Sequence, residues 1–149
     1  MRAGFSLGLR LETDINSEDT AKVDRGRATL LEALAVARGV NSHYLGGVVF
    51  GALAKYPGPT SQKARENSIS VIKELAQEAA RDGVTIGLEF VNRYESNLLN
   101  TVQQTLDYMD LVGEANVVVH ADVYHMNIEE NGFREPLLAC GEQLGYVHI

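Results

Sequence analysis

The segment VVVHADVYHMNIEE, residues 117–130, joins an apolar run to a dense group of polar side chains. Three consecutive valines are typical of a strand that is buried on both faces of a parallel sheet. The polar residues that follow, Asp122 and His125 among them, carry the kinds of group that bind ligands or metals. We therefore interpret this segment as a strand that ends at a functional rim.

Similar apolar, β-branched runs recur along the chain and alternate with segments of helical period. The predicted strands cover residues 4–9, 43–50, 84–91, 116–124 and 146–149. The predicted helices begin at Ser17 or Asp19, at Thr60 or Ser61, at Asn100 or Thr101, and at Pro136, and they end at Gly39, Gly83, Gly113 and Gly145. The alternation predicts an α/β fold with about five parallel strands and four intervening helices.

Two architectures fit this alternation: an open, doubly wound sheet or part of a (βα)8 TIM barrel. A complete barrel usually takes about 250 residues, whereas this chain has 149. A chain that ends on a strand, with no helix to cover it, also indicates a partial fold. We expect residues 1–149 to form a single truncated TIM-barrel domain.

The composition of the chain argues against several classes of partner and cellular location. The net charge of -7 leaves no basic surface for nucleic acid, which is therefore not an expected partner. No apolar run approaches the roughly 20 residues of a membrane span. The only cysteine, Cys140, excludes an internal disulfide, and the first residues lack the pattern of a signal peptide. We expect a cytoplasmic protein without membrane partners.

Three candidate metal ligands stand at or near the ends of successive predicted strands: Glu89, Asp122 and His148. Because parallel strands end at the same edge of a sheet, residues spaced by one βα unit converge there. Carboxylates and an imidazole suit Mn²⁺, Mg²⁺, Co²⁺ or Zn²⁺. Each residue alone also has a structural interpretation, as a helix cap, an ion-pair partner or a surface histidine.

Further polar residues lie in the loops beside these candidates. Glu95 follows Glu89 in a polar loop suited to the hydroxyl groups of a polyol, although Arg93 and Glu95 could instead form a loop salt bridge. His125 could donate to a ligand oxygen, whereas His120 fits a buried and satisfied core histidine. The adjacent Glu129 and Glu130 fit most simply a charged loop or a helix start.

The segments LEFVNRYESNLLNT (88–101), VHADVYHMNIEE (119–130) and LGYVHI (144–149) resemble those of the ketose 3-epimerases. This group includes D-tagatose 3-epimerase and D-psicose 3-epimerase, within the xylose-isomerase-like TIM barrels. The resemblance runs through most of the chain, from about the third barrel strand to the seventh. It implies a metal-dependent sugar isomerase that epimerises a ketose at C3 through a cis-enediolate.

The resemblance also implies roles for individual residues. Glu89 matches a metal ligand that is also a catalytic acid/base, Asp122 and His148 match two further ligands, and Glu95 and His125 match residues that contact the sugar. The implied cofactor is a divalent metal, Mn²⁺ first, with Co²⁺ or Mg²⁺ as alternatives. The implied partner is a ketose substrate, and a homo-oligomer is expected. The family's second catalytic glutamate has no counterpart in these 149 residues, so the isolated chain is expected to be inactive.

Two other functions stay open at this point. One is an endonuclease of the same superfamily that acts at apurinic sites, for which the acidic charge is unfavourable. The other is a non-catalytic barrel fragment that associates with itself to cover exposed sheet edges.

Overall fold

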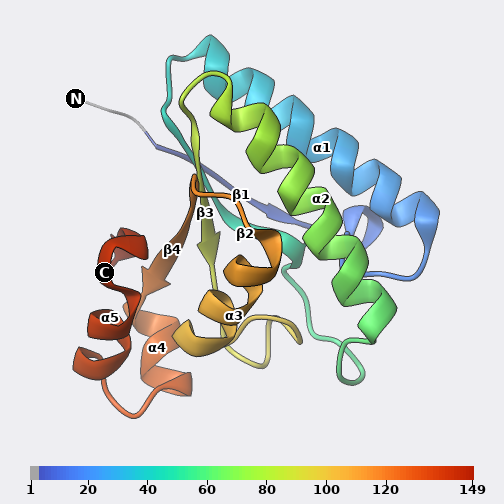
Figure 1. Cartoon of the computed structure of the whole chain (residues 1–149). Coiled ribbons are helices and arrows are strands. Elements are labelled where there is room, and N and C mark those ends of the chain that lie inside the picture. Colours follow the sequence, from blue (N-terminus) through green and yellow to red (C-terminus); the bar gives the residue numbers. More distant parts are fainter. Residues whose placement is uncertain (1–3) are drawn as a thin grey trace.

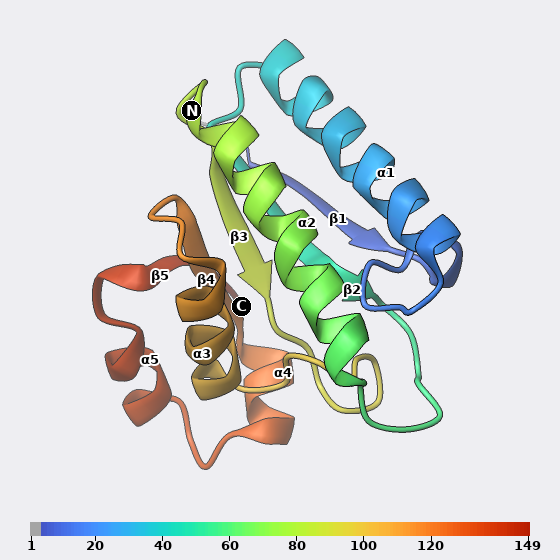
Figure 2. The same cartoon turned by 45° about the vertical axis from the view of Figure 1, so that its right-hand side comes forward.

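The computed structural model describes residues 4–149, in which five parallel strands form one sheet in the order of the chain. The strands are β1 (Phe5–Leu9), β2 (Tyr44–Ala52), β3 (Thr85–Glu89), β4 (Val117–Asp122) and β5 (Leu144–His148). A doubly wound sheet reverses its strand order at a switch point, and this sheet has no reversal. The order therefore decides for a segment of a (βα)8 barrel, as does the placement of α1, α2 and α3 along one side of the sheet (Figures 1 and 2).

The predicted helix starts are confirmed where a polar cap was identified. The long helices are α1 (Thr20–Gly39), α2 (Gln62–Ala80) and α3 (Val102–Val112). Their N-cap side chains, Asp19, Ser61 and Thr101, each accept a hydrogen bond from a backbone N–H of the first turn. None of the helices in the described part of the chain has both the length and the apolar composition that a membrane crossing requires.

The prediction for the segment between β4 and β5 was partly wrong. The strand ends at Asp122 rather than near Tyr124, and a short helix, α4 (Val123–Glu129), begins at once. A second helix, α5 (Arg134–Cys140), follows, and Gly145 lies within β5 rather than ending a helix. The described residues therefore contain five α-helices rather than four, together with the 3-10 turns η1 (Leu11–Thr13) and η2 (Gly141–Gln143).

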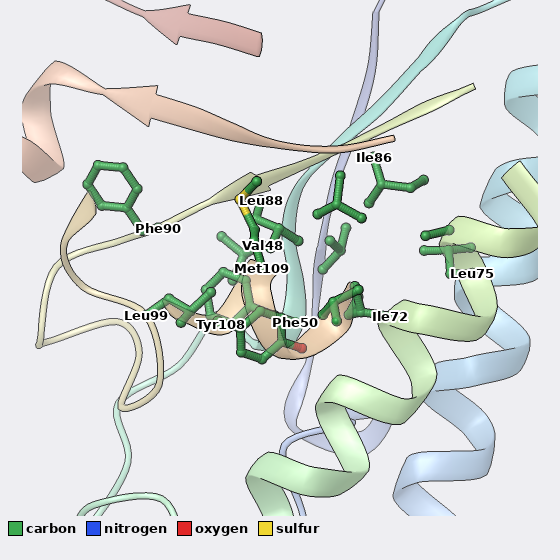
Figure 3. Close-up of a cluster of buried hydrophobic side chains, with 14 of the residues drawn as sticks. Val48, Phe50, Ile72, Leu75, Ile86, Leu88, Phe90, Leu99, Tyr108 and Met109 are labelled. Atoms are coloured by element: carbon green, nitrogen blue, oxygen red, sulfur yellow. The ribbon is translucent and has the colours of Figure 1, made fainter. Parts of the chain in front are cut away.

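The hydrophobic core lies between the sheet and the helices that cover it (Figure 3). β2 is buried along most of its length, and Phe50 points from it towards Tyr108 of α3, with ring centroids 6.5 Å apart. The Tyr108 hydroxyl is satisfied by Ser68 of α2 at 2.7 Å. Burial of such large side chains is the main stabilising contribution to a fold of this kind, and here it fixes α2 and α3 on the sheet.

Two glycines of α1 give a matched test of how closely this helix approaches the loop after β1. A Cβ atom at Gly26 would lie 2.3 Å from the Thr13 carbonyl oxygen and 2.5 Å from Cγ2 of Ile15, whereas nothing lies within 4 Å of one at Gly39. We expect Gly26→Ala to lower the free energy of unfolding by about 1–3 kcal/mol. Gly39→Ala should leave it unchanged or raise it by up to about 1 kcal/mol. Urea unfolding measures both, and equal effects would contradict the close approach.

Candidate active site at the carboxyl ends of the strands

Glu89, Asp122 and His148 are each the last residue of a strand, β3, β4 and β5 respectively. The register places Asp122 directly opposite His148, while Glu89 lies opposite His120, two residues before Asp122. Such a stagger between neighbouring strands accompanies the tilt of strands in a barrel. The structure thus brings the three predicted ligands to one rim.

The side chains of these three residues approach one another closely. Nδ1 of His148 lies 2.6 Å from Oδ2 of Asp122 and 3.7 Å from Oε1 of Glu89. Burial raises the pKa of the Glu89 carboxyl above its usual value, and the nearby Asp122 carboxylate raises it further, whereas His148 opposes the shift. Two carboxylates that repel one another beside an imidazole are an arrangement that a divalent cation would stabilise.

The two carboxylate oxygens of Asp122 have different partners. Oδ1 accepts hydrogen bonds from the backbone N–H groups of Tyr124, at 2.7 Å, and His125, at 3.3 Å, and so caps α4. Oδ2 faces His148. This cap explains why β4 ends at Asp122. The carboxylate accepts from the N–H groups of Tyr124 and His125, which in a longer strand would have to bond to a neighbouring strand.

Substitutions at Asp122 can test the contribution of the α4 cap separately from the contact with His148. Asparagine is as good an N-cap as aspartate, whereas alanine provides no acceptor. We expect Asp122→Ala to lower the free energy of unfolding by about 1 kcal/mol and Asp122→Asn to lower it by much less. Thermal or urea unfolding measures the difference. Equal losses in the two variants would show that the cap does not contribute to stability.

His120 is buried as expected, but only one of its two ring nitrogens has a hydrogen-bond partner among the described residues. Its Nδ1 lies 3.0 Å from the Tyr44 hydroxyl, while its Nε2 has no hydrogen-bond partner among the described residues and lies 4.0 Å from Oε1 of Glu89. Burial lowers the pKa of His120 to about 4, so the ring is neutral near pH 7 and forms no ion pair with Glu89. Burial also raises the pKa of Tyr44, so its hydroxyl keeps its proton and shares a hydrogen bond with Nδ1 of His120.

Glycines in the sheet make room for the Tyr44 ring. A Cβ atom at Gly87 would lie 1.8 Å from the Tyr44 hydroxyl oxygen, and one at Gly46 would lie 2.6 Å from it. The Tyr44 ring also stacks on Tyr146 of β5 at a centroid distance of 5.5 Å. Tyr44 and Tyr146 line a cavity of about 230 Å³ together with Gly4, Phe5, Ser6, Glu89, His120 and His148. No local sequence pattern indicates this role of Tyr44, because its partners lie far away along the chain.

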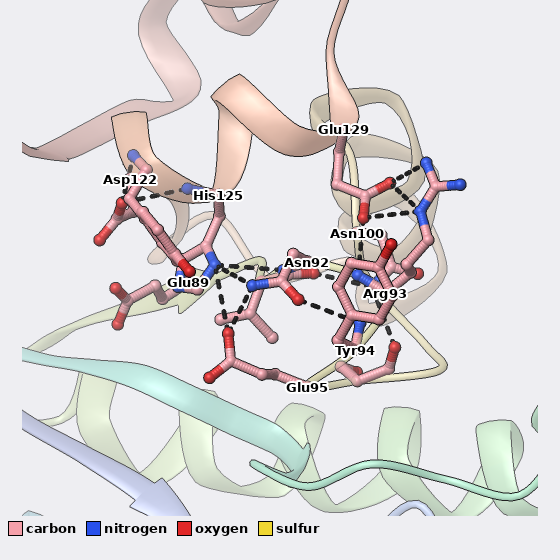
Figure 4. Close-up of polar contacts among 12 residues, drawn as sticks. Glu89, Asn92, Arg93, Tyr94, Glu95, Asn100, Asp122, His125 and Glu129 are labelled. Carbon is pink, nitrogen blue, oxygen red and sulfur yellow. Dashed lines mark hydrogen bonds and ion pairs between the residues drawn. The ribbon is translucent and has the colours of Figure 1, made fainter.

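The loop after β3 approaches the first turns of α4 (Figure 4). The Asn92 backbone N–H donates to Nδ1 of His125 at 3.2 Å, and the Asn92 side-chain amide lies 3.0 Å from the same nitrogen. Neutral His125 therefore carries its proton on Nε2, as a donor. The Asn92 amide also donates to Oε2 of Glu95. Glu95 and His125, the two predicted sugar contacts, are thus connected through Asn92, and Arg93 pairs with Glu129 instead of Glu95.

Two overlapping groups of described residues could hold a metal ion, with ligand atoms within 4.8 Å of one another. One group is Glu89, His120 and His148, and the other is Glu89, Asp122 and His125. Glu89 belongs to both. The donor set contains only oxygen and imidazole nitrogen, which suits the cations expected from the sequence.

A family model described as xylose isomerase-like TIM barrel matches residues 3–149. The chain belongs to this family. It is 47% identical over its whole length to the L-ribulose 3-epimerase of Methylomonas sp. strain DH-1 and 40% identical to the ketose 3-epimerase of Arthrobacter globiformis. It also matches the crystal structure of a D-allulose 3-epimerase from Methylomonas sp. in complex with D-allulose, with a TM-score of 0.97 and 47% identity over the whole chain.

The chain covers 52% of each of these three relatives, so it spans about half of their length. The resemblance to ketose 3-epimerases seen in the sequence is confirmed, as is the partial TIM-barrel fold. The roles of Glu89, Glu95, Asp122, His125 and His148 stay predictions, now with a defined geometry.

Proposed function

We propose that the complete protein containing this chain is a metal-dependent ketose 3-epimerase. The observation that supports this most directly is the meeting of Glu89, Asp122 and His148 at the ends of consecutive strands. Sequence similarity to relatives named L-ribulose 3-epimerase and ketose 3-epimerase also supports the proposal. The substrate class is then a ketose, and the alternatives of D-fructose, D-tagatose, D-allulose and L-ribulose are separated by assay.

Glu89, Asp122 and His148 would hold the divalent cation, with Mn²⁺ proposed first and Co²⁺ or Mg²⁺ as alternatives. These residues fit such an ion because two carboxylates lie beside an imidazole, and burial already opposes the negative charge of Glu89. When bound, a divalent cation polarises the ketose carbonyl and makes the C3 proton more acidic.

Glu89 would move the proton at C3. Its raised pKa lies closer to the working pH than that of an exposed carboxylate, which favours exchange of a proton in both directions. Removal of the proton from C3 gives a cis-enediolate, and return of a proton on the opposite face inverts C3. A second acid/base is needed on that face, and the family resemblance assigns it to a segment outside these 149 residues. We therefore propose that the 149-residue chain alone does not turn over sugar.

The other predicted contacts would orient the sugar. His125 presents Nε2–H as a donor to a sugar oxygen, because Asn92 occupies its Nδ1. Glu95, which is partly exposed beside it, would accept from a hydroxyl group. A donor and an acceptor at fixed separation hold one orientation of a polyol, and orientation is a large part of catalysis.

The assay that tests the proposal adds Mn²⁺ and each ketose in turn to the complete protein. We expect C3-epimer formation, detected by sugar chromatography, and a loss of roughly a thousandfold in kcat for Glu89→Gln. Glu74→Gln, a substitution on the outer helix α2, is the charge-matched control and should be as active as the wild type. Absence of turnover across the panel, or equal activity of the two variants, would refute the assignment.

Metal binding can be measured without turnover. We expect saturable Mn²⁺ binding in calorimetry or in the loss of the free-ion electron paramagnetic resonance signal. Asp122→Asn and His148→Gln should each weaken the affinity by at least roughly tenfold, although Asp122→Asn keeps the cap of α4. Glu130→Gln serves as the control and should bind Mn²⁺ as the wild type does. Unchanged affinity in the first two variants would exclude this ligand set.

A further inference from the structure

We infer that Glu129 is a positioning residue for the sugar-contact loop, here defined as residues 92–95. It acts through Arg93 and does not touch the substrate itself. The inference rests on the proposed function, since it is that function which gives Glu95 and His125 their sugar. Nothing in the sequence assigned a chemical role to Glu129.

The carboxylate of Glu129 makes several hydrogen bonds to Arg93 (Figure 4). Oε1 accepts from the Arg93 backbone N–H at 2.6 Å and from Nε at 3.0 Å, and Oε2 accepts from Nη2 at 2.7 Å. The Glu129 side chain is 4% exposed, whereas that of Arg93 is 62% exposed. The bond to the backbone N–H is decisive, because it fixes the path of the loop as well as the position of a side chain.

Glu129 and His125 are four residues apart on α4 and so lie on the same face of the helix. Their partners, Arg93 and Asn92, are adjacent in the sugar-contact loop. Figure 4 shows Asn92 between the two contacts, with Glu95 below it. Two adjacent loop residues are therefore attached to two points on one helix face. One attachment would leave the loop free to pivot, whereas two fix its orientation.

An exposed ion pair usually contributes little to stability. This pair differs because the carboxylate is buried and accepts a backbone N–H as well as a bidentate guanidinium contact. Hydrogen bonds from Arg93 lower the pKa of Glu129, in agreement with a carboxylate that stays charged. The expected effect of its loss is local, since Asn92 would then hold Glu95 and His125 less rigidly.

The neighbouring Glu130 provides a matched control within the same segment. Its Oε1 accepts from the backbone N–H of Val102 at 2.8 Å, in the first turn of α3. The two adjacent glutamates thus have the same charge and hold different elements. Glu129 holds the sugar-contact loop, and Glu130 holds the start of α3.

The test compares Glu129→Gln, Arg93→Ala, their double variant and Glu130→Gln in the complete Mn²⁺-loaded protein. We expect KM for the best ketose of the panel to rise about tenfold in both single variants, with kcat changed by less than about threefold. The double variant should be no worse than the poorer single variant, because the two residues form one contact. Glu130→Gln should lower the melting temperature and leave KM unchanged.

Amide hydrogen exchange gives a second readout that does not need the substrate. Exchange should rise at residues 92–97 in Glu129→Gln and at the start of α3 in Glu130→Gln. Equal changes of KM in the two glutamate variants, or unchanged exchange at 92–97 in Glu129→Gln, would overturn the inference. A wild-type protein that turns over no ketose would instead refute the proposed function, and the exchange pattern would still decide whether Glu129 holds this loop.

Discussion

Parallel pairing of consecutive strands determines where the helices, the core and the candidate site lie. Each strand must be followed by a segment that returns the chain to the starting edge, and right-handed crossovers put these segments on one face of the sheet. The opposite face is left for side chains such as Tyr44, His120 and Tyr146. All strand ends then meet at one rim, so residues far apart in sequence become neighbours without any special contact between their loops.

Within this arrangement, burial decides which polar groups are charged. His120 lies on the inner face, where removal from water favours the neutral ring and Nδ1 shares a hydrogen bond with the Tyr44 hydroxyl. Glu89 lies at the rim, where burial and Asp122 both oppose its ionisation. Glu129 lies on the far side of the sugar-contact loop, where the guanidinium of Arg93 favours the charged form. Three titratable groups in one region thus have three different electrostatic environments.

Local signals made much of the fold predictable. Asp19, Ser61 and Thr101 are polar residues ahead of a helical period, and each caps the helix that was expected there. Convergence of Glu89, Asp122 and His148 was also predictable, because it needs only the parallel order of the strands. The start of α4 was not, since Val123 and Tyr124 continue the apolar character of β4 and only the Asp122 cap ends the strand.

Contacts between distant segments could not be read from the chain. Arg93 has Glu95 two residues away and Glu129 thirty-six residues away, and sequence proximity favoured the wrong partner. The same holds for the contact of Tyr44 with His120, which depends on the glycines at 46 and 87. Such pairs depend on the register and tilt of the strands, which the hydrophobic pattern alone does not specify.

The double attachment of the loop to α4 has a consequence for engineering. Residues proposed to contact the sugar are an obvious target when substrate preference is to be altered, and a loop is ordinarily the easiest part of a fold to exchange. Here residues 92–95 and α4 form one transplantable unit, because Asn92 and Arg93 find their partners on that helix. A graft of the loop without α4 would carry over the chemical groups and lose their orientation.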